Sequence, residues 1–226
     1  MTMSLYKIKQ EEYFTRVRHD LVSLMPKTGS IKVLEIGSGG GDTLVYLKHS
    51  NRASEVVGVD VFKLEGTNQD HELIDQFIIA DIENQELDLE KEYFDAIICG
   101  DVLEHLVDPW TVLSKVEKFL KPGGQLIVSV PNIRFYKVLY KIIFKGDFQY
   151  DPLGGVLDKT HLRFFCKKNL VDLVSLPNFK FELVTSIQRF PGHPMSWKVN
   201  LFNKLTLMIF DDFFASQFIA VSKKEG

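Results

Sequence analysis

The sequence has little of what marks several large classes of protein. Cysteine occurs only twice in 226 residues, at Cys99 and Cys166, and the two form no Cys-x-x-Cys pair. This argues against a disulfide framework and against a zinc site, and it fits a reducing, cytoplasmic setting. Basic residues are not in excess either, since the formal net charge is −3. A nucleic-acid partner is therefore not expected.

Long apolar runs are also missing. No stretch reaches the roughly 18 apolar residues that a membrane-spanning helix needs. The first ten residues, MTMSLYKIKQ, lack the apolar region of a signal peptide. We therefore expect no stable membrane insertion and a cytoplasmic localisation. With 45% hydrophobic and 25% charged residues, the composition is that of one soluble globular domain with a sizeable core.

Helix and strand signals alternate along the chain. The apolar runs are short and continuous, as in strands that are buried on both faces of a parallel sheet. Strands are expected at 31–37, 55–60, 76–81, 92–101, 124–132, 179–190 and 216–224, and helices at 8–25, 41–50, 108–124, 133–144 and 167–177. This order predicts an α/β fold: a Rossmann-like, doubly wound, mostly parallel sheet with helices on both faces and a C-terminal antiparallel strand pair.

We expect a single domain with four parts. Residues 1–28 form an N-terminal helix, 30–132 a cofactor-binding half, 133–216 an acceptor-side half and 217–224 the last strand. Within the third part, residues 146–165 are glycine-rich and aromatic, which indicates a structured excursion from the sheet. Residues 196–214 are more apolar than a solvent-facing segment. They are candidates for a homodimer interface, a cap on the acceptor pocket or, least favoured, a membrane contact.

The stretch VLEIGSGGGDTL, residues 33–44, contains a glycine-rich turn between a strand and a helix. Gly37 and Gly39 match the first two positions of the dinucleotide fingerprint GxGxxG, but Asp42 stands at the third. An acid at the start of a helix competes with a phosphate for the amides there. Glu35 adds negative charge, and no Gly-Lys-Ser/Thr follows, which excludes a P-loop. A ligand without phosphate fits this turn better.

The spacing Glu35-x-Gly37-x-Gly39-x-Gly41 resembles that of the class I S-adenosylmethionine-dependent methyltransferases. Further motifs of the family follow in order: Asp60 after VVGV, Asp81 after IIA, FDAIICGDVLEHLVDP from residue 94, and LKPGGQLIVSVPN from residue 120. The resemblance covers about residues 30–132. It is similar in detail to the ubiquinone-biosynthesis O-methyltransferases, with their Leu-Glu-His stretch.

The resemblance implies S-adenosylmethionine as cofactor and S-adenosylhomocysteine as product. Asp60 would bind the ribose diol, since a carboxylate can accept two hydrogen bonds. Asp81 would lie near the adenine amino group, beside an apolar contact from Ile82. The expected cofactor-binding residues are Glu35, Gly37, Ser38, Gly39, Gly41, Asp60, Val61, Asp81, Ile82, Gly100 and Asp101. Gly41 could instead serve only to start the helix close to the strand.

Two histidines are candidates for proton transfer to or from the acceptor. His105 follows the fourth strand, and His161 lies in DKTHLRFF with Asp158 three residues before it and Arg163 two after. Asp158 could orient His161 as a base, and Arg163 could bind an acidic or hydroxyl-rich substrate. The alternatives are that His161 only anchors the excursion and that His105 only lines the pocket. A metal at Asp101, Glu104 and His105 is a third option, less favoured than no metal.

The leading functional hypothesis is methyl transfer to a small-molecule acceptor, with oxygen favoured over nitrogen or carbon. The Asp-x-Thr-His-x-Arg-Phe-Phe stretch at 158–165 resembles one in bacterial saccharide-pathway methyltransferases, which points to a saccharide or lipid-linked acceptor. Two alternatives remain open. One is an NAD(P)-dependent oxidoreductase, which Asp42 opposes. The other is a partner subunit that binds the cofactor but is catalytically inactive.

Overall fold

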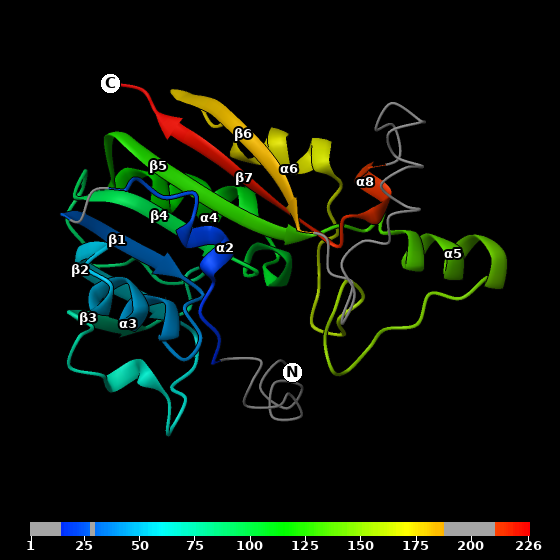
Figure 1. Cartoon of the computed structure of the whole chain (residues 1–226), viewed down its shortest axis with the longest axis horizontal. Helices are drawn as coiled ribbons and strands as arrows, with labels where there is room; N and C mark the ends of the chain where they lie inside the picture. Colours follow the sequence, from blue (N-terminus) through cyan, green and yellow to red (C-terminus); the bar gives the residue numbers. More distant parts are fainter. Residues whose placement is uncertain (1–14, 28–29, 188–210) are drawn as a thin grey trace.

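A seven-stranded sheet organises the computed structural model, which describes residues 15–27, 30–187 and 211–226 (Figure 1). The strand order is β3-β2-β1-β4-β5-β7-β6. Strands β1 to β5 pair in parallel, whereas β7 pairs antiparallel with both β5 and β6. The bounds are β1 Ile31–Ile36, β2 Ala53–Asp60, β3 Gln76–Ile79, β4 Phe94–Gly100, β5 Leu120–Pro131, β6 Phe179–Ile187 and β7 Gln217–Lys224. The predicted fold class is confirmed.

Helices cover both faces of the sheet and enclose two cores. In β1, Val33 belongs to the core that contains α2 (His19–Val22) and α3 (Asp42–His49). Its neighbour Leu34 belongs to the opposite core, which contains α4 (Pro109–Val116) and α6 (Lys167–Val174). Because successive side chains of a strand point to opposite faces, continuous apolar strands can supply both cores at once.

The direction of strand order reverses between β1 and β4, which are paired neighbours at the centre of the sheet. In open α/β sheets, ligands bind outside the carboxyl ends of the strands at such a point. The glycine turn follows β1, and the short 3₁₀ helix η3 (Leu103–His105) follows β4. The fold therefore brings the glycine turn and the segment of Asp101 and His105 to one edge of the sheet.

Two helix predictions need correction. Residues 15–18 are not helical, and α2 begins only at His19; residues 8–14 lie outside the described part of the chain. The helix expected at 108–124 ends at Val116 and passes through the 3₁₀ helix η4 (Glu117–Phe119) into β5. The Pro-Gly-Gly stretch thus lies within β5, where the pairing with β4 shifts register. Such an irregularity accommodates a proline and two glycines in a strand.

The first part of the acceptor-side half, residues 133–165, extends away from the sheet. The amphipathic helix α5 (Tyr136–Lys145) projects beyond the end of β5 in Figure 1. The predicted excursion returns from it through a bridge between Asp151 and Asp158, and a second bridge joins Phe165 to Asn132 after β5. The short helix α8 (Asp211–Phe214) leads into β7. Most of the apolar segment 196–214 lies outside the described residues, so its proposed roles stay predictions.

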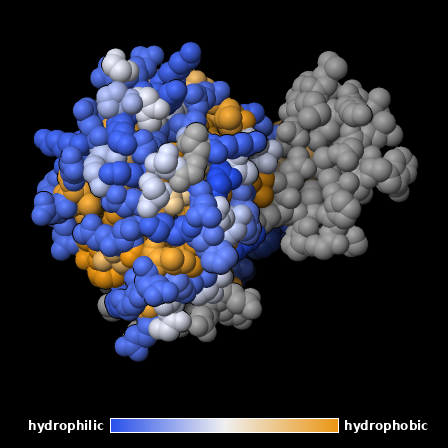
Figure 2. All heavy atoms as spheres, turned by 60° about the vertical axis from the view of Figure 1, so that its left-hand side comes forward, coloured by the Kyte–Doolittle hydropathy of each residue, from blue (hydrophilic) through white to orange (hydrophobic). Residues whose placement is uncertain are grey.

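The face in Figure 2 is hydrophilic over most of its area, with hydrophobic side chains confined to smaller areas. Within the described ranges, no helix has both the length and the apolar character to cross a bilayer. The remaining short element is the 3₁₀ helix η2 (Asn68–Asp70), which lies beside the glycine turn.

Candidate active site

The glycine turn crosses the carboxyl end of β2 and is held there by backbone and side-chain hydrogen bonds. The amides of Gly37 and Ser38 both donate to the carbonyl oxygen of Val59, at 2.8 and 3.1 Å. The amide of Gly39 donates to Oδ2 of Asp60 at 2.8 Å. Oδ1 of Asp60 accepts from the amide of Phe62 at 3.1 Å. Asp60 therefore joins the turn to the loop after β2.

Sequence reasoning missed Gln69, which fixes the other side of the turn. Its Nε2 donates to the carbonyl oxygen of Gly39 at 2.8 Å and to that of Phe62 at 3.0 Å, and the side chain is buried. A buried amide that joins two loops in this way makes both more rigid. No local motif marks Gln69, because its partners lie 30 and 7 residues away in sequence.

Two of the glycines are required by the shape of the turn. Gly37 has a φ of +72°, and a Cβ added there would lie 2.6 Å from Cβ of Val102. Gly41 is the N-cap of α3 with a φ of +86°, and an added Cβ would lie 2.9 Å from Cδ1 of Ile74. Only glycine adopts this backbone without strain and leaves this room. The backbone of the turn can therefore approach a ligand closely.

Glu35 ends up buried at the carboxyl end of β1, with Oε2 lacking a hydrogen-bond partner. Burial raises the pKa of Glu35 to about 8; Arg18 opposes this shift, and the carboxylate of Asp60 adds to it. A buried carboxyl with an unsatisfied oxygen is suited to bind a cation or a hydrogen-bond donor of a ligand. The predicted position of Glu35 at the turn is where the structure places it.

Asp42 does not cap the helix with its side chain, contrary to what its position suggests. Its Oδ1 accepts from Nδ2 of Asn68 at 3.1 Å, and its Oδ2 is buried without a hydrogen-bond partner. Burial raises the pKa of Asp42 above its ordinary value. The acid still places a carboxyl group where a dinucleotide would need its phosphates, so the argument against a dinucleotide holds.

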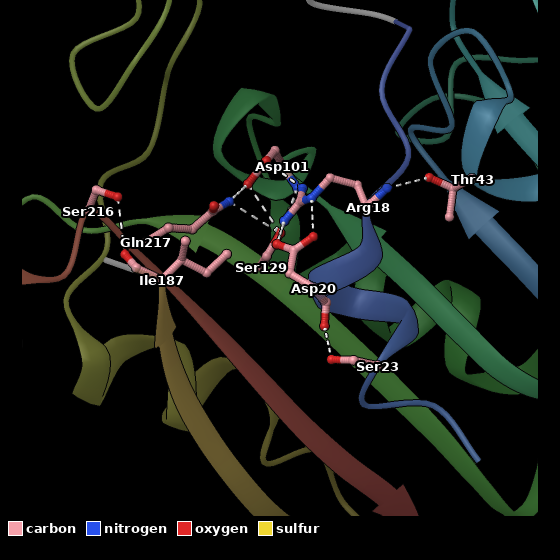
Figure 3. Close-up of polar contacts among 9 residues, drawn as sticks. All are labelled: Arg18, Asp20, Ser23, Thr43, Asp101, Ser129, Ile187, Ser216 and Gln217. Carbon is pink, nitrogen blue, oxygen red and sulfur yellow. Dashed lines mark hydrogen bonds and ion pairs between the residues drawn. The ribbon is translucent and has the colours of Figure 1, made fainter. Parts of the chain in front are cut away.

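Arg18, also missed from the sequence, lies across the carboxyl ends of β4 and β5 (Figure 3). Its guanidinium donates to Asp101 at 2.6 Å, to Asp20 at 2.8 Å and to the hydroxyl of Ser129 at 3.2 Å. Burial alone would lower the pKa of Arg18, but Asp101 and then Asp20 outweigh it and raise the pKa. The arginine is thus a fixed positive charge at the switch point.

Asp101 has its carboxylate held on several sides. Besides Arg18, it accepts from the hydroxyl of Ser129 at 3.1 Å and from Nε2 of Gln217. Its own φ is +54°, an uncommon backbone state that aspartate tolerates better than most residues. The preceding Gly100 has no room for a side chain, since an added Cβ would lie 2.8 Å from Cδ1 of Leu21. Gly100 and Asp101 therefore lie at the carboxyl end of β4, where the cofactor site was expected.

The residues expected near the adenine lie on the β2–β3 side. Asp81 follows β3 and accepts from the amide of Glu83 and from Nδ2 of Asn84, at 3.0 and 2.9 Å. These bonds stabilise its own turn. Ile82 packs in the core on the α4 face, and Val61 is 49% exposed. Contacts of Asp81, Ile82 and Val61 with a cofactor stay predictions.

The two candidate histidines lie together beside this edge. Their rings form an edge-to-face pair with centroids 4.7 Å apart. The excursion brings His161 there, because the amides of Leu162 and Arg163 donate to the carbonyl oxygen of Glu104 at 2.8 and 3.0 Å. The Nδ1 atoms face backbone carbonyls, that of Thr160 for His105 and that of Val156 for His161, at 3.2 and 3.0 Å. Two segments about 55 residues apart thus form one cluster.

Asp158 and Arg163 both form hydrogen bonds with the backbone in or beside the excursion. Oδ1 of Asp158 accepts from the amide and the hydroxyl of Thr160, at 2.8 and 2.7 Å. The guanidinium of Arg163 donates to the carbonyl oxygens of Val107 and Leu162. Both contacts brace the excursion. Orientation of His161 by Asp158 and substrate binding by Arg163 therefore stay predictions.

The sequence and the fold of the chain are similar to those of known methyltransferases. Residues 34–128 match the family described as Methyltransferase domain. The ubiquinone biosynthesis O-methyltransferase of Aliivibrio fischeri is 28% identical over 123 residues, which cover 50% of this chain and 49% of that protein. The S-adenosylmethionine-dependent methyltransferase of Mesorhizobium loti superposes with a TM-score of 0.61 at 17% identity, over 91% of this chain and 96% of that one.

Residues 34–128 therefore form a domain of the class I S-adenosylmethionine-dependent methyltransferase type. A further structural relative is found in the complex between the Trm112 methyltransferase activator of Haloferax volcanii and a methyltransferase. It has a TM-score of 0.64 at 14% identity, over 100% of this chain and 95% of that one. The structural matches show the shared fold. The chain spans about half the length of the A. fischeri relative, so that protein's acceptor does not carry over directly.

The residues of this site fit S-adenosylmethionine, the cofactor of the family. Gly37, Gly39 and Gly41 form a turn that a Cβ would obstruct at Gly37 and Gly41. Glu35 offers an unsatisfied buried oxygen, whereas the charge of Arg18 is already paired with Asp20 and Asp101. Asp60 retains acceptor capacity on a carboxylate already oriented by two amides. These residues would hold an amino-acid end and a ribose without any phosphate.

Proposed function

We propose that this methyltransferase transfers the methyl group of S-adenosylmethionine to an oxygen atom of a small-molecule acceptor. The observation that carries the proposal is the position of the Glu104, His105 and His161 side chains. Glu104 and His105 follow β4, and the excursion brings His161 beside them, next to the edge at which the glycine turn, Asp60 and Asp101 meet. The O-methyltransferase names of the similar proteins support oxygen as the methylated atom. We further propose a saccharide or lipid-linked acceptor, on the basis of the stretch 158–165.

The chemistry is a displacement at carbon. The acceptor oxygen forms a bond to the methyl carbon, the carbon–sulfur bond breaks, and its electron pair stays on sulfur to give S-adenosylhomocysteine. Alignment and exclusion of water supply much of the acceleration, because the sulfonium is already activated. A hydroxyl acceptor must also lose its proton. The pair His105 and His161 lies where that proton can be accepted or its loss promoted.

The first test is a comparison of ligands by thermal shift. S-adenosylhomocysteine and S-adenosylmethionine are expected to raise the unfolding midpoint, whereas NAD and NADP are not. At about 100 times its dissociation constant a ligand adds roughly 2.7 kcal/mol, or about 5–10 °C for a domain of this size. A shift with NAD or NADP alone would overturn the proposal in favour of an oxidoreductase.

The second test separates binding from turnover. Transfer from methyl-labelled S-adenosylmethionine is measured with phenolic, saccharide and lipid-linked hydroxyl compounds. The variant His161→Ala is expected to keep the thermal shift with S-adenosylhomocysteine and to lose turnover. If His161→Ala loses the thermal shift together with turnover, His161 only anchors the excursion. If the wild type binds cofactor and methylates none of these compounds, the chain is better explained as an inactive binding subunit.

A further inference from the structure

Glu104 is a buried carboxyl group that the fold leaves unsatisfied. Its side chain is 1% exposed, and neither Oε1 nor Oε2 has a hydrogen-bond partner. Its backbone is well fixed, since its carbonyl oxygen accepts from Leu162 and Arg163. Buried polar groups are nearly always hydrogen-bonded, because an unsatisfied one costs a few kcal/mol. Two adjacent unsatisfied oxygens therefore indicate a ligand.

Two imidazole side chains, which are potential metal ligands, lie beside this carboxyl group. Nε2 of His161 lies 3.9 Å from Oε1 of Glu104. One potential ligand atom from each of Glu104, His105 and His161 lies within 4.8 Å of the others. Ligands at about 2.1 Å from a cation are at most about 4.2 Å apart, so closure by roughly 0.5–1.5 Å would complete the site. Small rotations of three side chains supply such a movement.

The backbone around the histidines also suits a metal centre. Metal-bound histidines commonly donate their second ring N–H to a backbone carbonyl, which fixes the tautomer and the ring orientation. Nδ1 of His105 and Nδ1 of His161 each face such a carbonyl, from Thr160 and Val156. With the proton on Nδ1, the lone pair of each neutral imidazole is on Nε2.

We propose that Glu104, His105 and His161 bind a divalent transition-metal ion of the zinc class. Two imidazoles and one carboxylate favour such an ion over magnesium, which prefers oxygen ligands. Among residues 15–27, 30–187 and 211–226, these three form the only group with this geometry. The set differs from the Asp101, Glu104 and His105 option of the sequence, because Arg18, Ser129 and Gln217 already bind Asp101.

The proposed ion would give the histidine pair a definite role in methyl transfer. Three protein ligands leave a coordination position open for the acceptor hydroxyl, and a bound cation lowers the pKa of that hydroxyl. The proton is then released to solvent before or during transfer, and the histidines act as ligands rather than as free bases. This role rests on the proposed function, whereas metal binding itself does not.

The test measures metal binding without an acceptor. Untagged protein is stripped with a chelator and titrated with Zn²⁺ by calorimetry and with Co²⁺ by visible absorption. We expect one ion per chain and Co²⁺ bands typical of nitrogen and oxygen ligands. Glu104→Gln and His161→Gln should each weaken binding at least about 100-fold. His49→Gln, at an exposed position on α3, is the matched control and should bind like the wild type.

Two outcomes would overturn the proposal. One is a wild type that takes up no Zn²⁺ or Co²⁺ at a stoichiometric level. The other is equal affinity in the wild type and in both ligand variants. A thermal shift with S-adenosylhomocysteine checks that each variant is folded, and it also tests the cofactor site independently. Loss of metal binding with the cofactor shift intact supports the metal site, whatever the acceptor proves to be.

Discussion

At the scale of single residues, buried carboxyl groups distinguish this site from an ordinary strand end. Glu35 and Glu104 are both almost fully buried, and both have unsatisfied carboxylate oxygens. Desolvation raises the pKa of each, to about 8 for Glu35 and well above the ordinary value for Glu104. Arg18 opposes the shift in both. The contacts of Glu35 with Thr43 and of Glu104 with His161 leave carboxylate oxygens unsatisfied, so each acid is better explained by a ligand than by stability.

Glu35 makes a testable contribution to the pH dependence of stability. Below pH 4.5 both the folded and unfolded states hold its proton; between about 4.5 and 8 only the folded state does. The folded state then binds more protons, so the free energy of unfolding falls as pH rises through this range. Glu35→Gln should remove that fall, which amounts to at most about 5 kcal/mol.

Urea unfolding of both proteins at pH 5, 6.5, 8 and 9.5 measures this difference. The advantage of Glu35→Gln over the wild type should grow with pH and level off above about 8. Glu90→Gln, at an exposed position, controls for the general effect of removing a negative charge. Parallel pH curves for the wild type and Glu35→Gln would contradict a raised pKa for Glu35.

At the scale of elements, the connection from β1 to α3 combines steric and hydrogen-bonding requirements. Its amides bind Val59 and Asp60, and Gln69 binds its carbonyl oxygen at Gly39. Gly37 packs against Val102, which links the turn to the segment after β4. The glycine turn and the segment after β4 are therefore packed directly against each other.

Gly37→Ala should damage both stability and cofactor binding. The new Cβ would meet Val102 at 2.6 Å, and the φ of +72° is strained for alanine. Overpacking and strain together predict a loss of roughly 2–4 kcal/mol. Gly66→Ala is the matched control, because Gly66 has a φ of +76° but no atom within 4 Å of an added Cβ. It should cost only about 1 kcal/mol.

Chemical unfolding and S-adenosylhomocysteine affinity are measured for both glycine variants. The steric argument requires a clearly larger loss for Gly37→Ala in both measurements. Equal losses would mean that backbone strain alone explains the glycine, and that contact with Val102 is unimportant.

At the scale of the whole molecule, Asn132 connects the sheet to the acceptor-side half. It is fully buried after β5, and its Nδ2 donates to the carbonyl oxygens of Asp212 and Ala215 at 2.7 and 2.8 Å. Its Oδ1 accepts from the amide of Arg134. It also forms the bridge to Phe165 that ends the excursion carrying His161. The side chain of Asn132 thus joins the approach to β7 to the segment after β5, and its backbone joins the end of the excursion.

Asn132→Ala should therefore destabilise the protein by roughly 2–4 kcal/mol, because it leaves buried carbonyls and an amide unsatisfied. Asn84→Ala is the control, since Asn84 is exposed and bonds only within its own turn; its effect should stay within about 0.5 kcal/mol. Denaturant unfolding measures both. A small effect for Asn132→Ala would show that water replaces its bonds.

Local sequence was sufficient for the order of elements and for the glycine turn. Buried parallel strands are continuous apolar runs, and a turn that approaches a ligand needs glycine, so both leave a mark within a few neighbouring residues. The resemblance to the methyltransferase family rests on such motifs from Glu35 to Asp101 and is confirmed, whereas the cofactor-binding roles of these residues stay predictions. The helix expected at 8–25 is wrong for residues 15–18, because an apolar period of 3.6 residues does not require a helix where tertiary bonds compete. Arg18 bonds to Thr43 and Asp101 instead.

Packing alone brought together the groups whose partners are remote. Arg18 meets Asp101 across 83 residues, and His105 meets the segment of His161 across about 55. Such pairs have no sequence spacing to recognise, because only parallel strands ending at one edge make them neighbours. The same physical reason explains Gln69 and the exchange of Asp101 for His161 in the proposed metal site. Which carboxyl becomes buried without a partner depends on the folded chain, not on any motif.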